Sequence, residues 1–138
     1  MVSKVKSIEK RSFPRSEALD FDAELKKCNT TLLVATLNRE SREKLGGYCV
    51  FARVRRDVLL HKICVEEDVR RQGIAYAMIQ HVRQTVGQKS DKIILWVDEA
   101  RLPARKLYER CGFAELETCL DYYGPGRHGL KMILKLAT

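Results

Sequence analysis

The stretch 64-CVEEDVRRQGIAYA-77 passes from the pattern of a buried strand, through a short charged turn, into the pattern of a helix. A helix N-terminus directs free backbone N–H groups outward, and a glycine such as Gly73 lets a ligand approach the backbone. Arg70 and Arg71 stand beside it, so the stretch predicts a cradle for a pyrophosphate. A helix capped by a charged turn is the alternative interpretation. The stretch is neither a G-x-x-x-x-G-K-[ST] loop nor a G-x-G-x-x-G fingerprint, because Gly73 is its only glycine.

Outward from this stretch, hydrophobic periodicity predicts alternating strands and helices. Strands rich in β-branched and aromatic residues are predicted at 31–37, 47–54, 58–65, 92–97, 114–121 and 130–136. Helices are predicted at 3–13, 17–28, 74–86 and 103–111. The expected connections are a polar stretch at 38–46, a three-residue turn at 55–57 and a turn at Tyr123-Gly-Pro-Gly.

The strand at 92–97 is expected to lie parallel to the strand at 58–65, because a helix connects the two. We therefore predict one α/β domain over residues 1–138, with a mixed, mostly antiparallel twisted sheet flanked by helices.

Length and composition limit the classes of protein that fit. The 138 residues, 45% hydrophobic and 32% charged, allow one core. No apolar run approaches the roughly 20 residues of a membrane helix, so an intracellular protein, cytoplasmic or nuclear, is expected. The five cysteines form no C-x-x-C pair, which argues against a disulfide scaffold or a zinc ribbon, and no metal site is expected. The net charge of +8 favours an anionic partner.

Two motifs carry a resemblance to a known family. Arg70, Gly73 and Ala75 match the signature [RQ]-x-x-G-x-[GA], and ARKLYERCGF at 104–113 matches A-x-x-L-Y-x-x-x-G-F. In this order of elements the chain resembles the GNAT superfamily of acetyl-CoA-dependent N-acetyltransferases. Its tail, DYYGPG followed by GLKMIL, is similar to the closing hairpin of RimI-like and protein N-terminal acetyltransferases. The resemblance implies the GNAT fold, splayed between the strands at 58–65 and 92–97, with the usual first strand missing.

The resemblance also implies acetyl-CoA as the co-substrate. Its pantetheine arm would pair with the backbone of Ile63, Cys64 and Val65. Its pyrophosphate would bind the loop and the start of the helix, at Arg70, Arg71, Gln72, Gly73, Ile74 and Ala75. In the second motif the resemblance adds Ala104 and Arg101, the latter standing where the family usually has Asn and able to reach a CoA phosphate.

Acetyl transfer needs a neutral amine, a donor for the oxyanion and a proton for the leaving thiolate. The resemblance makes Tyr108 the expected acid; a tyrosine that only fills the gap between helix and sheet is the alternative. His61 is the candidate base, because it falls on one member of the histidine pair of arylalkylamine acetyltransferases. Glu66, Glu67 and a water relayed from the backbone are the alternatives. Cys64 lies near the expected thioester, but direct transfer needs no nucleophile.

The expected acceptor is a primary amine of a protein or peptide, because the tail is RimI-like. Trp96 would form a wall of the acceptor channel, and Tyr122 and Tyr123 would line its groove. His61 favours a small arylalkylamine or polyamine instead. A CoA-binding regulatory module without turnover is an alternative of another class, whereas nucleic-acid and membrane binding have no motif behind them. His128 is interpreted as structural or solvated, and a homodimer is an open alternative.

Overall fold

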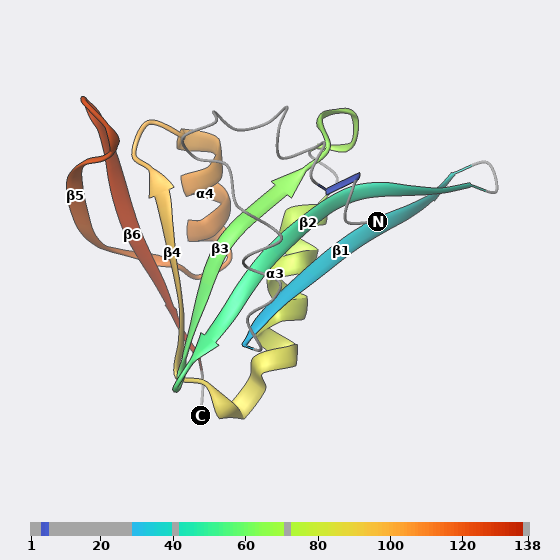
Figure 1. Ribbon diagram of the computed structural model, residues 1–138, viewed down its shortest axis with the longest axis horizontal. Helices are drawn as coiled ribbons and strands as arrows, with labels where there is room; N and C mark the ends of the chain where they lie inside the picture. Colours follow the sequence, from blue (N-terminus) through green and yellow to red (C-terminus); the bar gives the residue numbers. More distant parts are fainter. Residues whose placement is uncertain (1–3, 6–28, 40–41, 71–72, 137–138) are drawn as a thin grey trace.

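The computed structural model describes residues 4–5, 29–39, 42–70 and 73–136, which include one six-stranded sheet with two longer helices on one of its faces (Figure 1). The strands are β1 (Thr30–Arg39), β2 (Arg42–Val54), β3 (Asp57–Val65), β4 (Lys92–Asp98), β5 (Ala114–Gly124) and β6 (Arg127–Lys135). The helices are α3 (Ile74–Val86) and α4 (Leu102–Arg110), with 3₁₀ turns η2 (Glu67–Val69) and η3 (Gly87–Lys89). Apart from Lys4 and Val5, the predicted helices at 3–13 and 17–28 and the predicted loss of a first strand lie outside the described residues.

The strand order is β1-β2-β3-β4-β6-β5. Only β3 and β4 pair in parallel, as predicted, because α3 carries the chain across one face of the sheet between them. The other neighbours are antiparallel. The predicted class, a mixed and mostly antiparallel α/β sheet, is confirmed.

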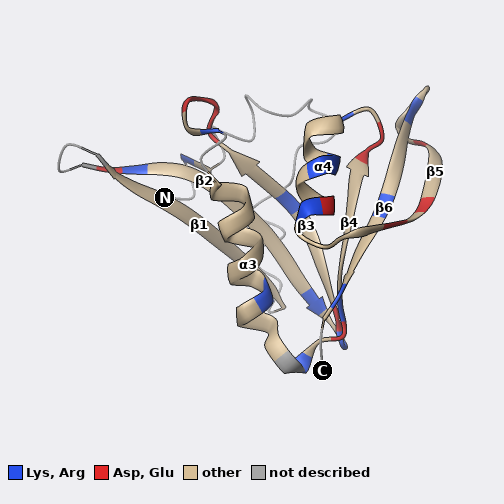
Figure 2. Cartoon of the chain, turned by 180° about the vertical axis from the view of Figure 1, so that it is seen from behind, with Lys and Arg blue, Asp and Glu red and all other residues tan. Residues whose placement is uncertain are grey.

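The main core lies between the sheet and the two helices, which cover the same face (Figure 2). From α3 it buries Met78, Ile79, Val82 and Val86, the apolar stripe predicted from their spacing of three and four residues. A smaller cluster on the opposite face contains Val5, Leu45, Tyr48, Val50 and Cys64. Both faces of the central strands are therefore covered, which agrees with their nearly continuous apolar sequence.

Three predicted connections are wrong in detail. The polar stretch at 38–46 is mostly strand, because β1 and β2 continue pairing as far as Arg39 and Arg42. The turn after β2 has two residues, Arg55 and Arg56, since Asp57 already pairs with Val54. The last turn is shorter than the predicted Tyr123-Gly-Pro-Gly, because β5 continues through Gly124.

Candidate active site

The sheet splits in its middle, between β3 and β4. These strands pair from Asp57 with Lys92 to Leu60 with Leu95, and no further (Figure 1). At the same point the register of β3 against β2 shifts, because Val50 pairs with Lys62 whereas the next residue, Phe51, pairs with Leu60. His61 is therefore the extra residue of a β-bulge. A bulge bends its strand, so His61 marks the point at which β3 turns away from β4.

Backbone groups of β3 face this split. The Glu66 N–H donates to the Gly46 carbonyl of β2 at 2.7 Å. Peptide groups alternate along a strand, so those of Val65 and Ile63 turn away from β2 and towards the split, whereas those of Cys64 turn towards β2. The Val65 carbonyl accepts a hydrogen bond from Arg70 Nε at 3.1 Å. Of the three predicted pantetheine partners, Ile63 and the N–H of Val65 therefore face the split, whereas the peptide groups of Cys64 face β2.

A cavity of about 570 Å³ opens between the splayed strands. It brings together both predicted catalytic residues and all three predicted acceptor residues. Its lining includes His61, Trp96, Arg101, Tyr108, Tyr122 and Tyr123. Ile63 lines it as well, but the alternative bases Glu66 and Glu67 do not. Residues from both halves of the sequence therefore meet in one cavity.

The predicted phosphate site lies outside this cavity, at the start of α3. Gly73 is the N-cap, with a φ of 79°, a backbone conformation that glycine adopts without strain. A Cβ built at Gly73 would meet no atom within 4 Å, so the backbone there is open to approach. Ile74 and Ala104 instead pack against the main core, and Arg71 and Gln72 are not among the described residues.

Tyr108 is buried on α4, at 8% exposure, with its ring packed edge-on against Phe113 at 5.9 Å between centroids. Burial raises the pKa of Tyr108 to about 12, against the opposing effect of the positive charge of Arg101. The phenol therefore keeps its proton throughout the neutral range and can donate it as a hydrogen bond.

Aromatic side chains form one wall of the cavity. Trp96 of β4 and Tyr122 of β5 stack with ring centroids 4.7 Å apart and ring planes 8° from parallel. Tyr123 meets Tyr122 edge-on at 4.8 Å. The guanidinium of Arg127 lies 5.7 Å from the Tyr123 ring centre, within cation–π range. This wall provides a flat apolar surface in the same cavity as His61 and Tyr108, the two candidate catalytic residues.

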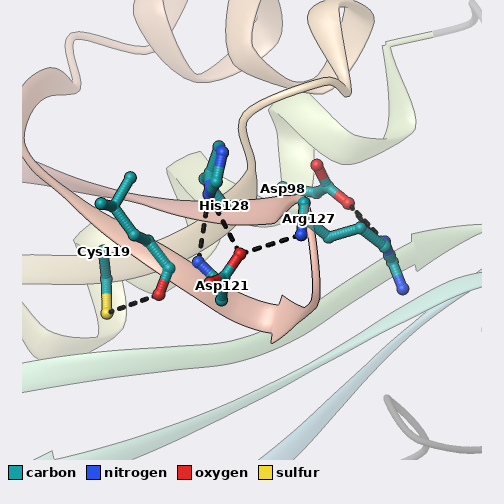
Figure 3. A network of polar contacts seen from close by, with 7 residues as sticks. Asp98, Cys119, Asp121, Arg127 and His128 are labelled. Atoms are coloured by element: carbon teal, nitrogen blue, oxygen red, sulfur yellow. Dashed lines mark hydrogen bonds and ion pairs between the residues drawn. The ribbon is translucent and has the colours of Figure 1, made fainter.

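Asp98, at the end of β4, is a cavity residue that the sequence analysis missed. It is only 8% exposed, and its carboxylate accepts a hydrogen bond from the Ala100 N–H at 3.0 Å. It accepts another from Arg127 at 2.9 Å (Figure 3). Burial alone would raise the pKa of Asp98, but these donors stabilise the carboxylate, and the pKa is lowered. The available signal was a carboxylate directly after the apolar run KIILWV.

We expect Asp98→Asn to reduce the free energy of unfolding at pH 7 by about 1–3 kcal/mol, because Arg127 loses a charged partner. A lowered pKa stabilises the fold above the unfolded-state value of about 3.9, and this stabilisation disappears as pH falls through the folded-state value. Urea unfolding between pH 7 and pH 2.5 should therefore show the two proteins converge at low pH. Asp91→Asn is the control, with a much smaller effect, because its ion pair with Arg56 is exposed. A constant difference at every pH would contradict the charge interaction.

Among the residues that the structure describes, no three His, Cys, Asp or Glu side chains gather as metal ligands would. None of the helices in the described part of the chain has the length and apolar character needed to cross a membrane.

Comparison with known proteins places this splayed sheet in a class of acyl-transferring enzymes. The sequence profile of the acetyltransferase (GNAT) family matches residues 2–113, so the chain belongs to the GNAT family. It is an acetyl-CoA-dependent N-acetyltransferase, and both the family and the fold predicted from its motifs are confirmed. No curated protein sequence matches the chain.

Solved structures of similar fold include enzymes with different acceptors. The ribosomal-protein-S18-alanine N-acetyltransferase of Escherichia coli has a TM-score of 0.84 and 24% identity, covering 99% of this chain and 88% of its own. Arabidopsis thaliana NAA60, in complex with a bisubstrate analogue, has a TM-score of 0.85 and 19% identity, over 97% and 91%. Spermidine N-acetyltransferase of Vibrio cholerae, with CoA and spermine, has a TM-score of 0.68 and 18% identity, over 84% and 71%. At these identities the likeness establishes the fold alone.

Proposed function

We propose that the protein transfers the acetyl group of acetyl-CoA to a primary amine of a protein or peptide within the cavity between β3 and β4. One observation carries the proposal: His61, Tyr108 and the aromatic wall line the same cavity, at the point where β3 bends away from β4. A general base, an acid and an acceptor surface therefore converge where a thioester entering the split would end.

The acetyl-CoA half of this proposal rests on the part of β3 beyond Leu60, where β3 and β4 do not pair. Ile63 and Val65 direct peptide groups into the split, as a pantetheine arm would require. Arg70, in the chain between β3 and α3, donates a hydrogen bond to the Val65 carbonyl. The N-terminus of α3 at Gly73 is suited to a pyrophosphate, because helix N-termini attract anions.

The chemistry follows from the cavity residues. A neutral amine attacks the thioester carbonyl, forming the C–N bond and an oxyanion. Collapse of this intermediate breaks the C–S bond, and the sulfur takes a proton from the Tyr108 hydroxyl. The nitrogen loses a proton to neutral His61, which lines the same cavity as Tyr108. No covalent enzyme intermediate is needed, which agrees with Cys64 being buried in the cluster on the opposite face.

The acceptor class is supported by the wall and by the neighbours. Tyr122 remains 48% exposed, so the wall extends to the surface, where a peptide could continue beyond its reacting amine. The Escherichia coli neighbour is named for the acetylation of an alanine of ribosomal protein S18. The second candidate is a polyamine, because spermidine N-acetyltransferase of Vibrio cholerae shares the fold.

A panel of acceptors tests the proposal. Purified protein with acetyl-CoA would receive short peptides with free N-termini, the same peptides with blocked N-termini, spermidine and an arylalkylamine, and released CoA would be measured with a thiol reagent. We expect turnover with at least one free peptide and none with its blocked form. Turnover of spermidine or the arylalkylamine alone would refute the peptide assignment.

If His61 is the base, activity should rise with pH through the ionisation of its imidazole, because only the neutral form accepts a proton. His61→Gln should lower kcat and remove the inflection that this ionisation causes, with acetyl-CoA affinity unchanged. Deprotonation of the amine also raises activity with pH, so both proteins must be compared with the same acceptor. Superimposed profiles would assign the base to a water or to Glu66 or Glu67.

A further inference from the structure

The ladder between β5 and β6 is interrupted beside the aromatic wall. Cys119 pairs with Gly129, and the next pair is Gly124 with Arg127. Four residues of β5, 120–123, therefore stand opposite the single residue His128 of β6. This wide bulge contains both Tyr122 and Tyr123, so it determines how the two tyrosines enter the cavity.

Asp121 and His128 hold the bulge in place. Asp121 has a φ of 59°, a left-handed conformation that few residues other than glycine adopt, though Asp and Asn tolerate it. Its N–H donates to His128 Nδ1 at 3.0 Å, and its carboxylate accepts the Gly126 N–H at 2.8 Å (Figure 3). The His128 carbonyl accepts the Glu99 N–H at 2.9 Å. His128 thus joins the bulge, through its imidazole, to the chain that follows β4, through its carbonyl.

Gly129 provides the space into which the bulge turns Tyr122. A Cβ at Gly129 would lie 2.7–2.8 Å from Cγ, Cβ and Cδ1 of Tyr122, closer than Cβ atoms approach such neighbours. The φ of Gly129 is not positive, so the backbone itself would accept alanine. The missing side chain matters because the ring of Tyr122 lies against this backbone while it stacks on Trp96.

We propose that His128 and Gly129 are positioning residues for the acceptor. They hold Tyr122 flat against Trp96 and so fix the shape of the cavity wall that faces the acceptor amine. The acceptor role of this wall rests on the function proposed above, whereas the positioning itself does not. Neither residue lines the cavity, so each acts through Tyr122.

Trp96 makes the positioning measurable without any acceptor, because it is the single tryptophan of the chain. His128→Ala removes the acceptor of the Asp121 N–H, whereas His128→Asn supplies an amide oxygen near the position of Nδ1. We expect changed Trp96 emission and near-ultraviolet circular dichroism in His128→Ala and Gly129→Ala, and wild-type spectra in His128→Asn. Leu120→Ala is the matched control, because Leu120 lies in the same bulge and is 73% exposed.

The kinetic experiment uses the acceptor from the panel above that the wild-type protein acetylates fastest. His128→Ala and Gly129→Ala should raise the KM for this acceptor about tenfold or more, with kcat and acetyl-CoA affinity nearly unchanged. His128→Asn should restore the wild-type KM. Thermal unfolding confirms that each variant is folded.

Wild-type Trp96 spectra in both alanine variants would overturn the positioning. Altered spectra with an unchanged acceptor KM would overturn the role in acceptor binding, while turnover of a free peptide would leave the proposed function standing. Absence of turnover with every peptide would refute the proposed peptide function alone, because the spectra report on the wall in either case.

Discussion

Tyr108→Phe should lower kcat about 100- to 10,000-fold, the range typical of a lost general acid, with little change in acetyl-CoA affinity. The leaving thiolate then loses its proton donor, while the ring still packs against Phe113. Burial raises the pKa of Tyr108 to about 12, so the phenol stays protonated at every pH at which the assay is practical. Initial rates at saturating acetyl-CoA, together with calorimetric titration of CoA, would measure the two effects separately.

Tyr76→Phe is the matched control for this substitution. Tyr76 is 41% exposed on α3, outside the cavity, so the same loss of a hydroxyl should leave kcat unchanged. If kcat falls by less than about threefold in Tyr108→Phe, the tyrosine only fills space between helix and sheet.

Gly73→Leu should weaken acetyl-CoA binding about 10- to 100-fold. The new side chain would project into open space at the helix N-terminus, where we expect the pyrophosphate to meet backbone N–H groups. Each hydrogen bond to a charged group is worth about 1.5–3 kcal/mol, and about 1.4 kcal/mol is tenfold in affinity. Calorimetric titration with CoA measures the change directly.

Backbone strain is the competing cause, and two variants separate it from the steric effect. Gly126→Leu places the same side chain at a φ of 74°, also in open space, in the turn between β5 and β6. Gly73→Asn introduces a side chain, but asparagine tolerates a positive φ. We expect weaker CoA binding in Gly73→Asn and unchanged binding in Gly126→Leu. Normal CoA affinity in folded Gly73→Leu would refute a phosphate site at this helix.

The sequence predicted regular elements better than their irregularities. The apolar run at 92–97 corresponds to β4, because consecutive residues of that strand are buried on both faces, and the stripe from Ile74 to Val86 corresponds to α3, because that helix is buried on one face. The bulge at His61 could not be predicted, because it depends on how β3 registers against β2 rather than on local sequence. The extra residues opposite His128 escaped prediction for the same reason.

The site shows the same division. Tyr108 and Gly73 belong to motifs with fixed spacing, so the sequence predicts them as site residues. Asp98 and Gly129 belong to no such motif. Asp98 is recognisable only once Arg127 lies beside it in space. Gly129 is recognisable only once the ring of Tyr122 covers it. Contacts between residues distant in sequence are the information that local patterns lack.

The short parallel seam between β3 and β4 makes the sheet two antiparallel sheets joined at one end, β1–β3 and β4–β6–β5. A ligand that pairs with Ile63 and Val65 would serve as the missing length of strand between them. Cofactor binding and resistance to unfolding are then thermodynamically linked. Acetyl-CoA at about a hundred times its Kd would stabilise the folded chain by about 2.7 kcal/mol. The lifetime of this enzyme in a cell would consequently follow the supply of its own acetyl donor.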